Sequence, residues 1–152
     1  MKLLVNQIFE NKEAAALPGL LESGGLPALV SRLSAVHRAN LAAGLRLQSG
    51  APLFVLCPDD TTAENFANDL RSMLGEEVTC LGMRDFTFYS TEAASRQAEQ
   101  KRLAALFALA EGRSAVTVAS IPGLIQRTLP PETLRRAAFE LDAGGSYPVS
   151  YT

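Results

Sequence analysis

The residues best suited to chemistry stand at positions 34–40, Ser-Ala-Val-His-Arg-Ala-Asn, where a segment with helical periodicity begins. In α/β proteins the turn from the first strand into the first helix often binds phosphate, because free backbone N–H groups point at the anion. Such a loop needs glycines, a lysine for the β- and γ-phosphates and a Ser or Thr hydroxyl for magnesium. This stretch has no glycine before Gly44 and no lysine. We therefore expect that the chain neither binds nor hydrolyses ATP.

A catalytic triad or acid–base pair is equally poorly supported. His37 is the only histidine of the chain, and it stands near a predicted helix N-terminus, where the helix dipole disfavours the charged imidazolium. We interpret it as a neutral surface or capping residue. The acidic pairs Asp59/Asp60 and Glu92/Glu99 fit helix ends and solvated helix faces better than a catalytic pair. The sequence therefore predicts no catalytic and no cofactor-binding residue.

Composition indicates one ordinary domain with its own core. The chain has 152 residues, 47% of them hydrophobic and 20% charged, with a formal net charge of −2. That charge gives no overall basic field to attract nucleic acid or an anionic membrane, and no apolar run has the length of a membrane span. Cys57 and Cys80 form no CxxC pair and are too few for a zinc site, so we predict no metal site. We interpret them as buried thiols of a cytoplasmic protein.

One predicted loop, residues 83–91, combines a cation with aromatic rings. Aromatic side chains beside a basic residue can stack on a base or anchor a protein partner. The alternative, which we favour, is that Phe86 and Phe88 point inward and fill the edge of a sheet. The loop supplies the candidate contact residues of this chain, which are Arg84, Phe86, Phe88 and Tyr89.

Strands and helices are predicted to alternate after a helical segment at residues 1–25. Strands are expected over 28–33, 52–57, 77–82, 114–120 and 137–145. The run at 52–57 is apolar throughout, which is typical of a strand covered on both faces. This alternation predicts an α/β fold, a parallel sheet with helices on both faces.

The helices between these strands carry start and stop signals. One helix is expected from about 36 to 47 with Gly50 as its stop, and a second begins with a capping pair, Thr61 and Glu64, and stops at Gly75. A third is expected over 90–112, with Leu103, Leu106, Phe107 and Ala110 facing inward, and Ser120 caps a short fourth helix. We predict one α/β domain over 26–143, and in 144–152 the start of a linker, as in a piece of a longer protein.

Three stretches, 52–75, 84–112 and 116–134, resemble in order and spacing the N-terminal region of bacterial transcription-repair coupling factors, which is homologous to UvrB. Members of this family are large ATP-driven DNA translocases that displace stalled RNA polymerase and recruit UvrA for nucleotide excision repair. The resemblance covers roughly residues 20–152. It implies a RecA-like, P-loop helicase-like domain whose phosphate loop has degenerated, with positions 34–40 standing where relatives carry Gly-Lys-Thr.

The resemblance also implies a non-catalytic role for this chain. In the family the ATP and Mg site lies in a motor domain farther along the protein, as does the domain that binds RNA polymerase. The contacts with UvrA lie beyond Thr152. This chain alone is therefore expected to bind none of UvrA, RNA polymerase or double-stranded DNA tightly, and to associate with no membrane. The alternatives are a piece of an active UvrB-type DNA helicase, which the missing Gly-Lys-Thr opposes, or a stand-alone flavodoxin-like α/β protein.

Overall fold

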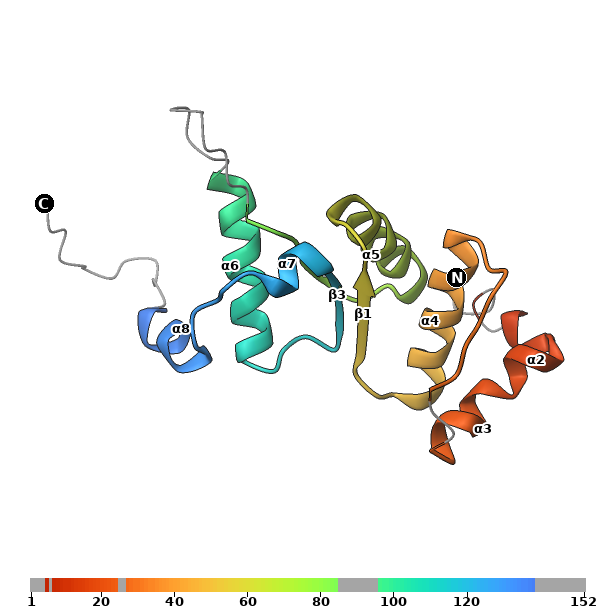
Figure 1. The fold of residues 1–152 in the computed structure, drawn as a ribbon. Helices are drawn as coiled ribbons and strands as arrows, with labels where there is room; N and C mark the ends of the chain where they lie inside the picture. Colours follow the sequence, from red (N-terminus) through yellow and green to blue (C-terminus); the bar gives the residue numbers. More distant parts are fainter. Residues whose placement is uncertain (1–4, 6, 25–26, 85–95, 139–152) are drawn as a thin grey trace, which may run out of the picture.

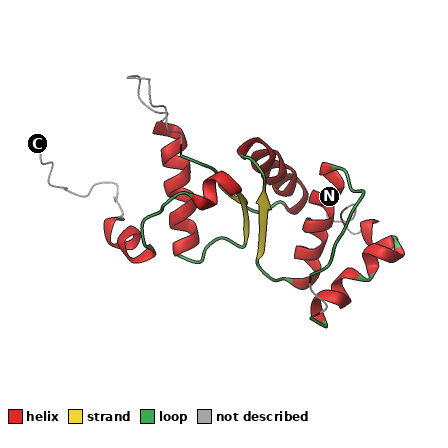
Figure 2. Cartoon of the chain, in the orientation of Figure 1, coloured by secondary structure: helices red, strands yellow, loops and turns green. Residues whose placement is uncertain are grey.

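The computed structural model describes residue 5 and residues 7–24, 27–84 and 96–138. Its centre is a parallel sheet of three strands, β1 (Leu53–Cys57), β2 (Thr79–Leu81) and β3 (Val116–Ser120). The strand order is β1-β3-β2, so β3 lies in the middle. Figures 1 and 2 show the sheet between two groups of helices. The predicted α/β class with a parallel sheet is confirmed.

Side-chain alternation along β3 divides the core into two halves. Val116 and Val118 face one side of the sheet, and Thr117 and Ala119 face the other, because successive residues of a strand point to opposite faces. In register, Val116 lies opposite Leu53 of β1, and Thr117 lies opposite Thr79 of β2. All five residues of β3 are buried. The central strand therefore supplies apolar contacts to both layers of helices.

Two helices, α4 (Ala35–Ser49) and α5 (Asp60–Leu74), pack against each other on the first side of the sheet. Both end where the sequence predicted, since Gly50 and Gly75 adopt left-handed backbone conformations as C-caps. The side chains that α5 buries recur at helical spacing. They are Ala63, Ala67, Leu70 and Leu74, and they join Val116 and Val118 in the larger core cluster.

The opposite side of the sheet is covered by α6 (Arg96–Ala110). The chain passes from β1 through α5 to β2, and returns through α6 to β3 in the opposite direction, so right-handed crossovers put these helices on opposite faces. Ala105 of α6 packs with Leu81 and Ala119 in the smaller core cluster. After β3 come α7 (Ile121–Ile125) and α8 (Pro131–Ala137), and α8 packs on α6. Helices therefore lie on both faces, as predicted.

The N-terminal helical segment docks on α4. It consists of η1 (Gln7–Glu10), α2 (Lys12–Ala15) and α3 (Leu17–Glu22), which confirms the predicted helical character of this region. The Phe9 ring lies so close to Gly44 that a Cβ there would come within 2.4 Å of it. Gly44, the first glycine after positions 34–40, therefore makes room for an aromatic ring rather than for an anion.

One predicted strand was wrong, and another lies mostly outside the described residues. Residues 28–33 form no strand and pair with nothing in the sheet; Leu29 is 94% exposed, and Arg32 has a φ of 64°, which an extended strand does not allow. Of the last predicted strand, 137–145, Ala137 is instead the final residue of the helix α8, which begins at Pro131, and Ala138 has an extended backbone. The rest of that predicted strand, from residue 139 onward, lies outside the described residues.

Burial of β1 also differs from the prediction. Leu53, Val55 and Cys57 point into the larger core, but Phe54 and Leu56 on the other face are 54% and 51% exposed. The prediction that both faces are covered was wrong because α6 packs over β2 and β3, and no helix of the described residues buries Phe54 or Leu56 on that side. The chain therefore exposes apolar sheet surface.

Close backbone packing at Gly123 gives a stability prediction. A Cβ at this position would stand 2.7 Å from the Leu81 carbonyl oxygen and 2.7 Å from the Gly82 carbonyl carbon, both rigid backbone atoms. We expect Gly123→Ala to lower the free energy of unfolding by about 1–3 kcal/mol, the usual cost of overpacking. Chemical denaturation measures this change in the free energy of unfolding. Gly19→Ala in α3, where a Cβ would meet nothing within 4 Å, is the matched control and should be neutral or slightly stabilising. Equal effects of the two substitutions would contradict this packing.

Candidate functional site

The carboxyl edge of the sheet is the place where an α/β fold of this kind normally binds a ligand. β1, β2 and β3 end at this edge, and α5 and α7 begin there. The N-terminus of α4 reaches the same edge, since this helix runs opposite in direction to β1 (Figure 1). The positions at which the sequence was tested for phosphate binding are therefore brought to one side of the molecule.

The start of α4 is capped by its own side chain. Ser34 Oγ accepts a hydrogen bond from the His37 N–H at 3.3 Å and lies 2.9 Å from His37 Nδ1. Both residues are exposed, which agrees with the interpretation of His37 as a surface or capping residue. The backbone that enters this helix comes from no strand. The strand–loop–helix geometry of a phosphate loop is therefore missing here.

The start of α5 carries a carboxylate. Asp59 Oδ1 accepts from the Thr62 N–H at 2.7 Å, and Oδ2 accepts from the Thr62 hydroxyl at 2.9 Å. These hydrogen bonds, that from the backbone first, lower the pKa of Asp59. The helix cap is therefore Asp59, and the predicted capping pair of Thr61 and Glu64 was wrong by two residues.

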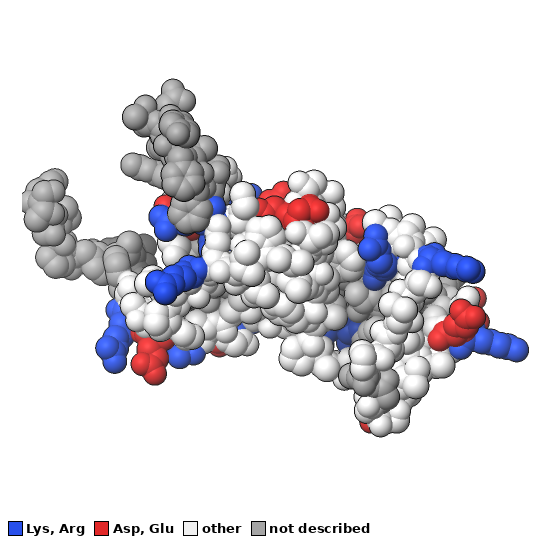
Figure 3. Space-filling view, in the orientation of Figure 1, with Lys and Arg blue, Asp and Glu red and all other residues white. Residues whose placement is uncertain are grey.

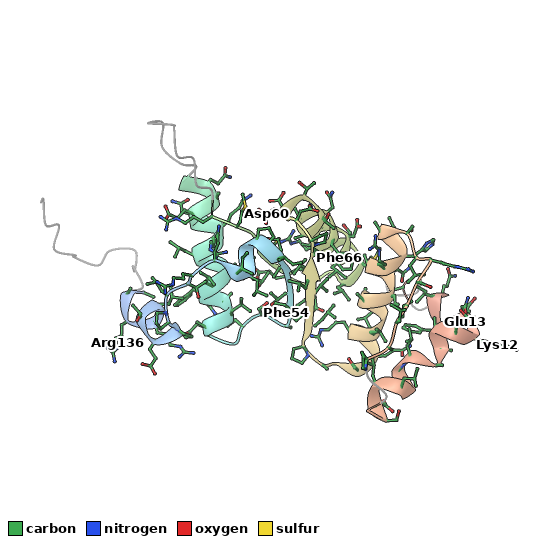
Figure 4. The ribbon with its side chains drawn as sticks, viewed as in Figure 1. Lys12, Glu13, Phe54, Asp60, Phe66 and Arg136 are labelled. Carbon is green, nitrogen blue, oxygen red and sulfur yellow. The ribbon has the colours of Figure 1, made fainter. Side chains whose placement is uncertain are left out.

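Asp60 joins two of the strand ends. Its carboxylate oxygens accept from the Met83 N–H at 3.1 and 3.3 Å, which ties the start of α5 to the segment after β2 (Figure 4). Ser120, at the end of β3, is fully buried, and its Oγ accepts from the Gly123 N–H at 2.9 Å. This confirms the predicted cap of α7. Side-chain oxygens at these strand ends thus accept backbone hydrogen bonds from within the chain.

Arg84 is the described member of the predicted contact residues. Its guanidinium Nη2 lies 2.9 Å from Glu99 Oε1 of α6. Its backbone N–H donates to Gln126 Oε1 at 2.6 Å, and its carbonyl accepts from Gln126 Nε2 at 3.2 Å. Arg84 is therefore bonded to residues around both α6 and α7. Phe86, Phe88 and Tyr89 lie outside the described residues.

Arg102 is a buried cation that the sequence analysis missed. It is only 6% exposed, and its Nη1 donates to the Gly82 carbonyl at 2.5 Å. Burial lowers its pKa, and the nearby Asp60 carboxylate opposes that shift. Leu103, predicted to face inward, is 45% exposed instead. Ala98 and Ala105 lie one helical turn before and one after Arg102. Small apolar side chains at this spacing are the sequence feature that could have identified the buried face of α6.

Some of the exposed apolar side chains lie on β1 and on α7, the helix that follows its neighbour β3. Phe54 and Leu56 belong to β1, and Ile121, Leu124 and Ile125 belong to α7, with Ile125 77% exposed. Figure 3 shows that the surface over α7 and the adjoining strands carries almost no charge on this face. Phe54 is labelled on this face in Figure 4. We name these five residues the apolar patch.

Both thiols are free and have reduced reactivity. Cys57 is buried and Cys80 is half-buried, and burial raises the pKa of each, so the thiolate is scarce at neutral pH. Within the described ranges no group of three His, Cys, Asp or Glu side chains could hold a metal ion. None of the helices in the described part of the chain is long and apolar enough to cross a membrane.

Comparison with known proteins adds no assignment. No protein-family model, curated protein or solved structure matches this chain.

The carboxylate cap of α5 gives a pH-dependent prediction. Because the pKa of Asp59 is lowered in the folded chain, its stabilising effect is present above the unfolded pKa of about 3.9 and is lost as the pH falls through the folded pKa. We expect Asp59→Ala to lower the melting temperature at pH 7, and the difference from wild type to shrink below about pH 4.

The uncharged cap of α7 provides the control. Ser120→Ala should cost about 0.5–2 kcal/mol, and its effect should not follow the titration of a carboxylate. The test compares the melting temperatures of the wild type, Asp59→Ala and Ser120→Ala between acid and neutral pH. A deficit in Asp59→Ala that stays constant with pH would show that its charge does not stabilise α5.

Proposed function

We propose that this chain is a non-catalytic, RecA-like domain of a transcription-repair coupling factor, one that acts through protein contacts. The family in this proposal rests on the sequence resemblance, and the observation that carries its non-catalytic part is the state of the helix N-termini at the carboxyl edge. Ser34, Asp59 and Ser120 each accept a hydrogen bond from the first turn of their own helix. A helicase-like domain that used nucleotide would need such N–H groups free for phosphate.

Electrostatics at the same edge supports this proposal. Asp59 and Asp60 place two carboxylates at the start of α5, and their negative charge repels a phosphate that approaches this helix N-terminus. A triphosphate would have to displace the caps and approach these carboxylates. The same argument weighs against an active UvrB-type helicase and against a flavodoxin-like protein, both of which bind phosphate at this edge.

The apolar patch supports a role in protein contact. Parallel sheets are normally covered by helices on both faces, and here the face of β1 with Phe54 and Leu56 is open. Contiguous exposed apolar surface marks interaction sites more often than it marks ordinary solvent-exposed surface. We infer that this patch packs on another domain of the coupling factor, while the ATP-driven motor and the UvrA contacts belong to other parts of that protein.

The first test concerns nucleotide. We expect no change in melting temperature on addition of millimolar Mg-ATP, whereas a ligand at about 100 times its dissociation constant would stabilise the fold by about 2.7 kcal/mol. Differential scanning fluorimetry measures this, with a protein that has an intact phosphate loop as positive control. A reproducible rise that disappears in Arg38→Ala would contradict the proposed loss of the nucleotide site.

The second test concerns membership of the family. We expect a chimera in which this chain replaces the matching N-terminal region of a bacterial coupling factor to retain displacement of stalled RNA polymerase and capture of UvrA. The same factor with that region deleted is the reference. Phe54→Glu with Leu56→Glu should leave the isolated chain folded and should impair the chimera, because both residues are exposed in the chain alone. If the isolated chain is folded but the chimera that contains it behaves like the factor with that region deleted, the assignment is contradicted.

A further inference from the structure

A second surface, separate from the apolar patch, lies along the outer edge of β2. A cavity of about 820 Å³ opens there between α5 and α6, and β2 forms its floor. Its lining from β2 and the adjoining residues consists of Glu77, Val78, Thr79, Cys80, Gly82 and Met83. We name this cavity the β2 groove.

The floor of the groove is an edge strand. β2 pairs with β3 on one side, and in the described residues no strand pairs with its other side. An edge strand presents a row of backbone N–H and C=O groups on which an extended peptide can add as a further strand. Such an addition needs room beside the strand, which α5 and α6 leave because they lie on opposite faces of the sheet.

Two internal hydrogen bonds set the length of the open edge. At one end Arg71 Nη2 donates to the Val78 carbonyl at 2.7 Å. At the other end the Met83 N–H donates to the Asp60 carboxylate. The Gly82 carbonyl already accepts from Arg102 Nη1, so the open edge is the backbone of 79–81, and a bound peptide extends beyond it at both ends.

The two walls of the groove carry opposite charge near the end of β2. The α5 wall carries the exposed Glu64, together with Asp60, whose carboxylate also holds the Met83 N–H, and the α6 wall carries the exposed Lys101 and the buried Arg102. Glu64 and Lys101 are exposed, and neither forms an ion pair with another residue of the described ranges. Farther along, the α6 wall consists of small side chains, Ala104, Ala105 and Ala108, which leave space for an apolar group.

The spacing of these charges matches an extended chain. Asp60 and Glu64 are one turn of helix apart, about 6 Å along the axis, and alternate residues of a strand are about 6.6 Å apart on one face. Two basic side chains at alternate positions can therefore meet the α5 wall, while the residue between them points to Lys101 on the opposite wall.

From this complementarity we propose that the β2 groove binds an extended peptide segment that adds to β2 as a fourth strand. The segment carries Lys or Arg at alternate positions toward α5 and Asp or Glu between them toward α6. The groove presents both signs of charge on opposite walls, so it selects an alternating peptide over a uniformly charged polymer. This proposal does not depend on the assignment to coupling factors.

The experiment uses the whole chain and two fluorescein-labelled peptides of eight residues, TKEKVTVT and TEKEVTVT, which differ in the order of their charges. Fluorescence anisotropy should show saturable binding of the first peptide and binding of the second weaker by roughly tenfold, equivalent to about 1.4 kcal/mol. N-methylation of alternate backbone nitrogens on the strand-pairing side should abolish binding of the first peptide, because it removes the hydrogen bonds to β2.

A charge exchange across the groove separates a specific site from general attraction. The double variant Glu64→Lys, Lys101→Glu should reverse the preference and bind TEKEVTVT more tightly, with the fold retained because both side chains are exposed. The matched control, Glu132→Lys with Arg136→Glu on α8, makes the same exchange outside the groove and should keep the wild-type preference. No saturable binding, equal binding of the two peptides, or an unchanged preference in the groove variant would each overturn the proposal.

Discussion

The burial of β3 is the constraint on which the rest of the structure depends. Parallel strands cannot pair through a tight turn, so each must be reached by a crossover, and the central strand is then covered on both faces. Val116 and Val118 pack under α5, while Ala119 packs under α6. Once β3 has this position, α5 and α6 must lie on opposite faces, and the three strand ends must meet at one edge. The two surfaces available for contact, the apolar patch and the β2 groove, both follow from this arrangement.

The carboxyl edge illustrates how a common binding place can be used for folding instead. A free helix N-terminus attracts anions because its first N–H groups have no intrahelical partner. Here Asp59 and Ser120 bond to those groups, and Asp60 and Gln126 connect neighbouring loops across the edge. The polar atoms at this edge therefore stabilise the relative positions of α5, α6 and α7.

The two edges of the sheet differ in the partners that they suit. Beside β1 the open surface is apolar and nearly uncharged, which favours another protein domain that buries it permanently. Beside β2 the walls are charged and the floor is a short edge strand, which favours a peptide bound through backbone hydrogen bonds and alternating ion pairs. Arg102 connects α6 to the sheet, because its buried guanidinium donates to the Gly82 carbonyl at the end of β2. This hydrogen bond explains why the Arg102 cation lies on a helix face that otherwise consists largely of alanines.

The sequence by itself determined the features that depend on neighbouring residues. The apolar runs predicted β1, β2 and β3, and glycines predicted the ends of α4 and α5, because a left-handed C-cap is a local property of the backbone. Ser120 was likewise identified as a cap from its place before Pro122. Tertiary structure alone decided the rest. Whether 28–33 pairs as a strand, whether Phe54 is covered and whether Arg102 or Leu103 faces the core all depend on which distant element packs there. A local sequence pattern does not specify these contacts, because the surfaces that form them meet only after the chain has folded.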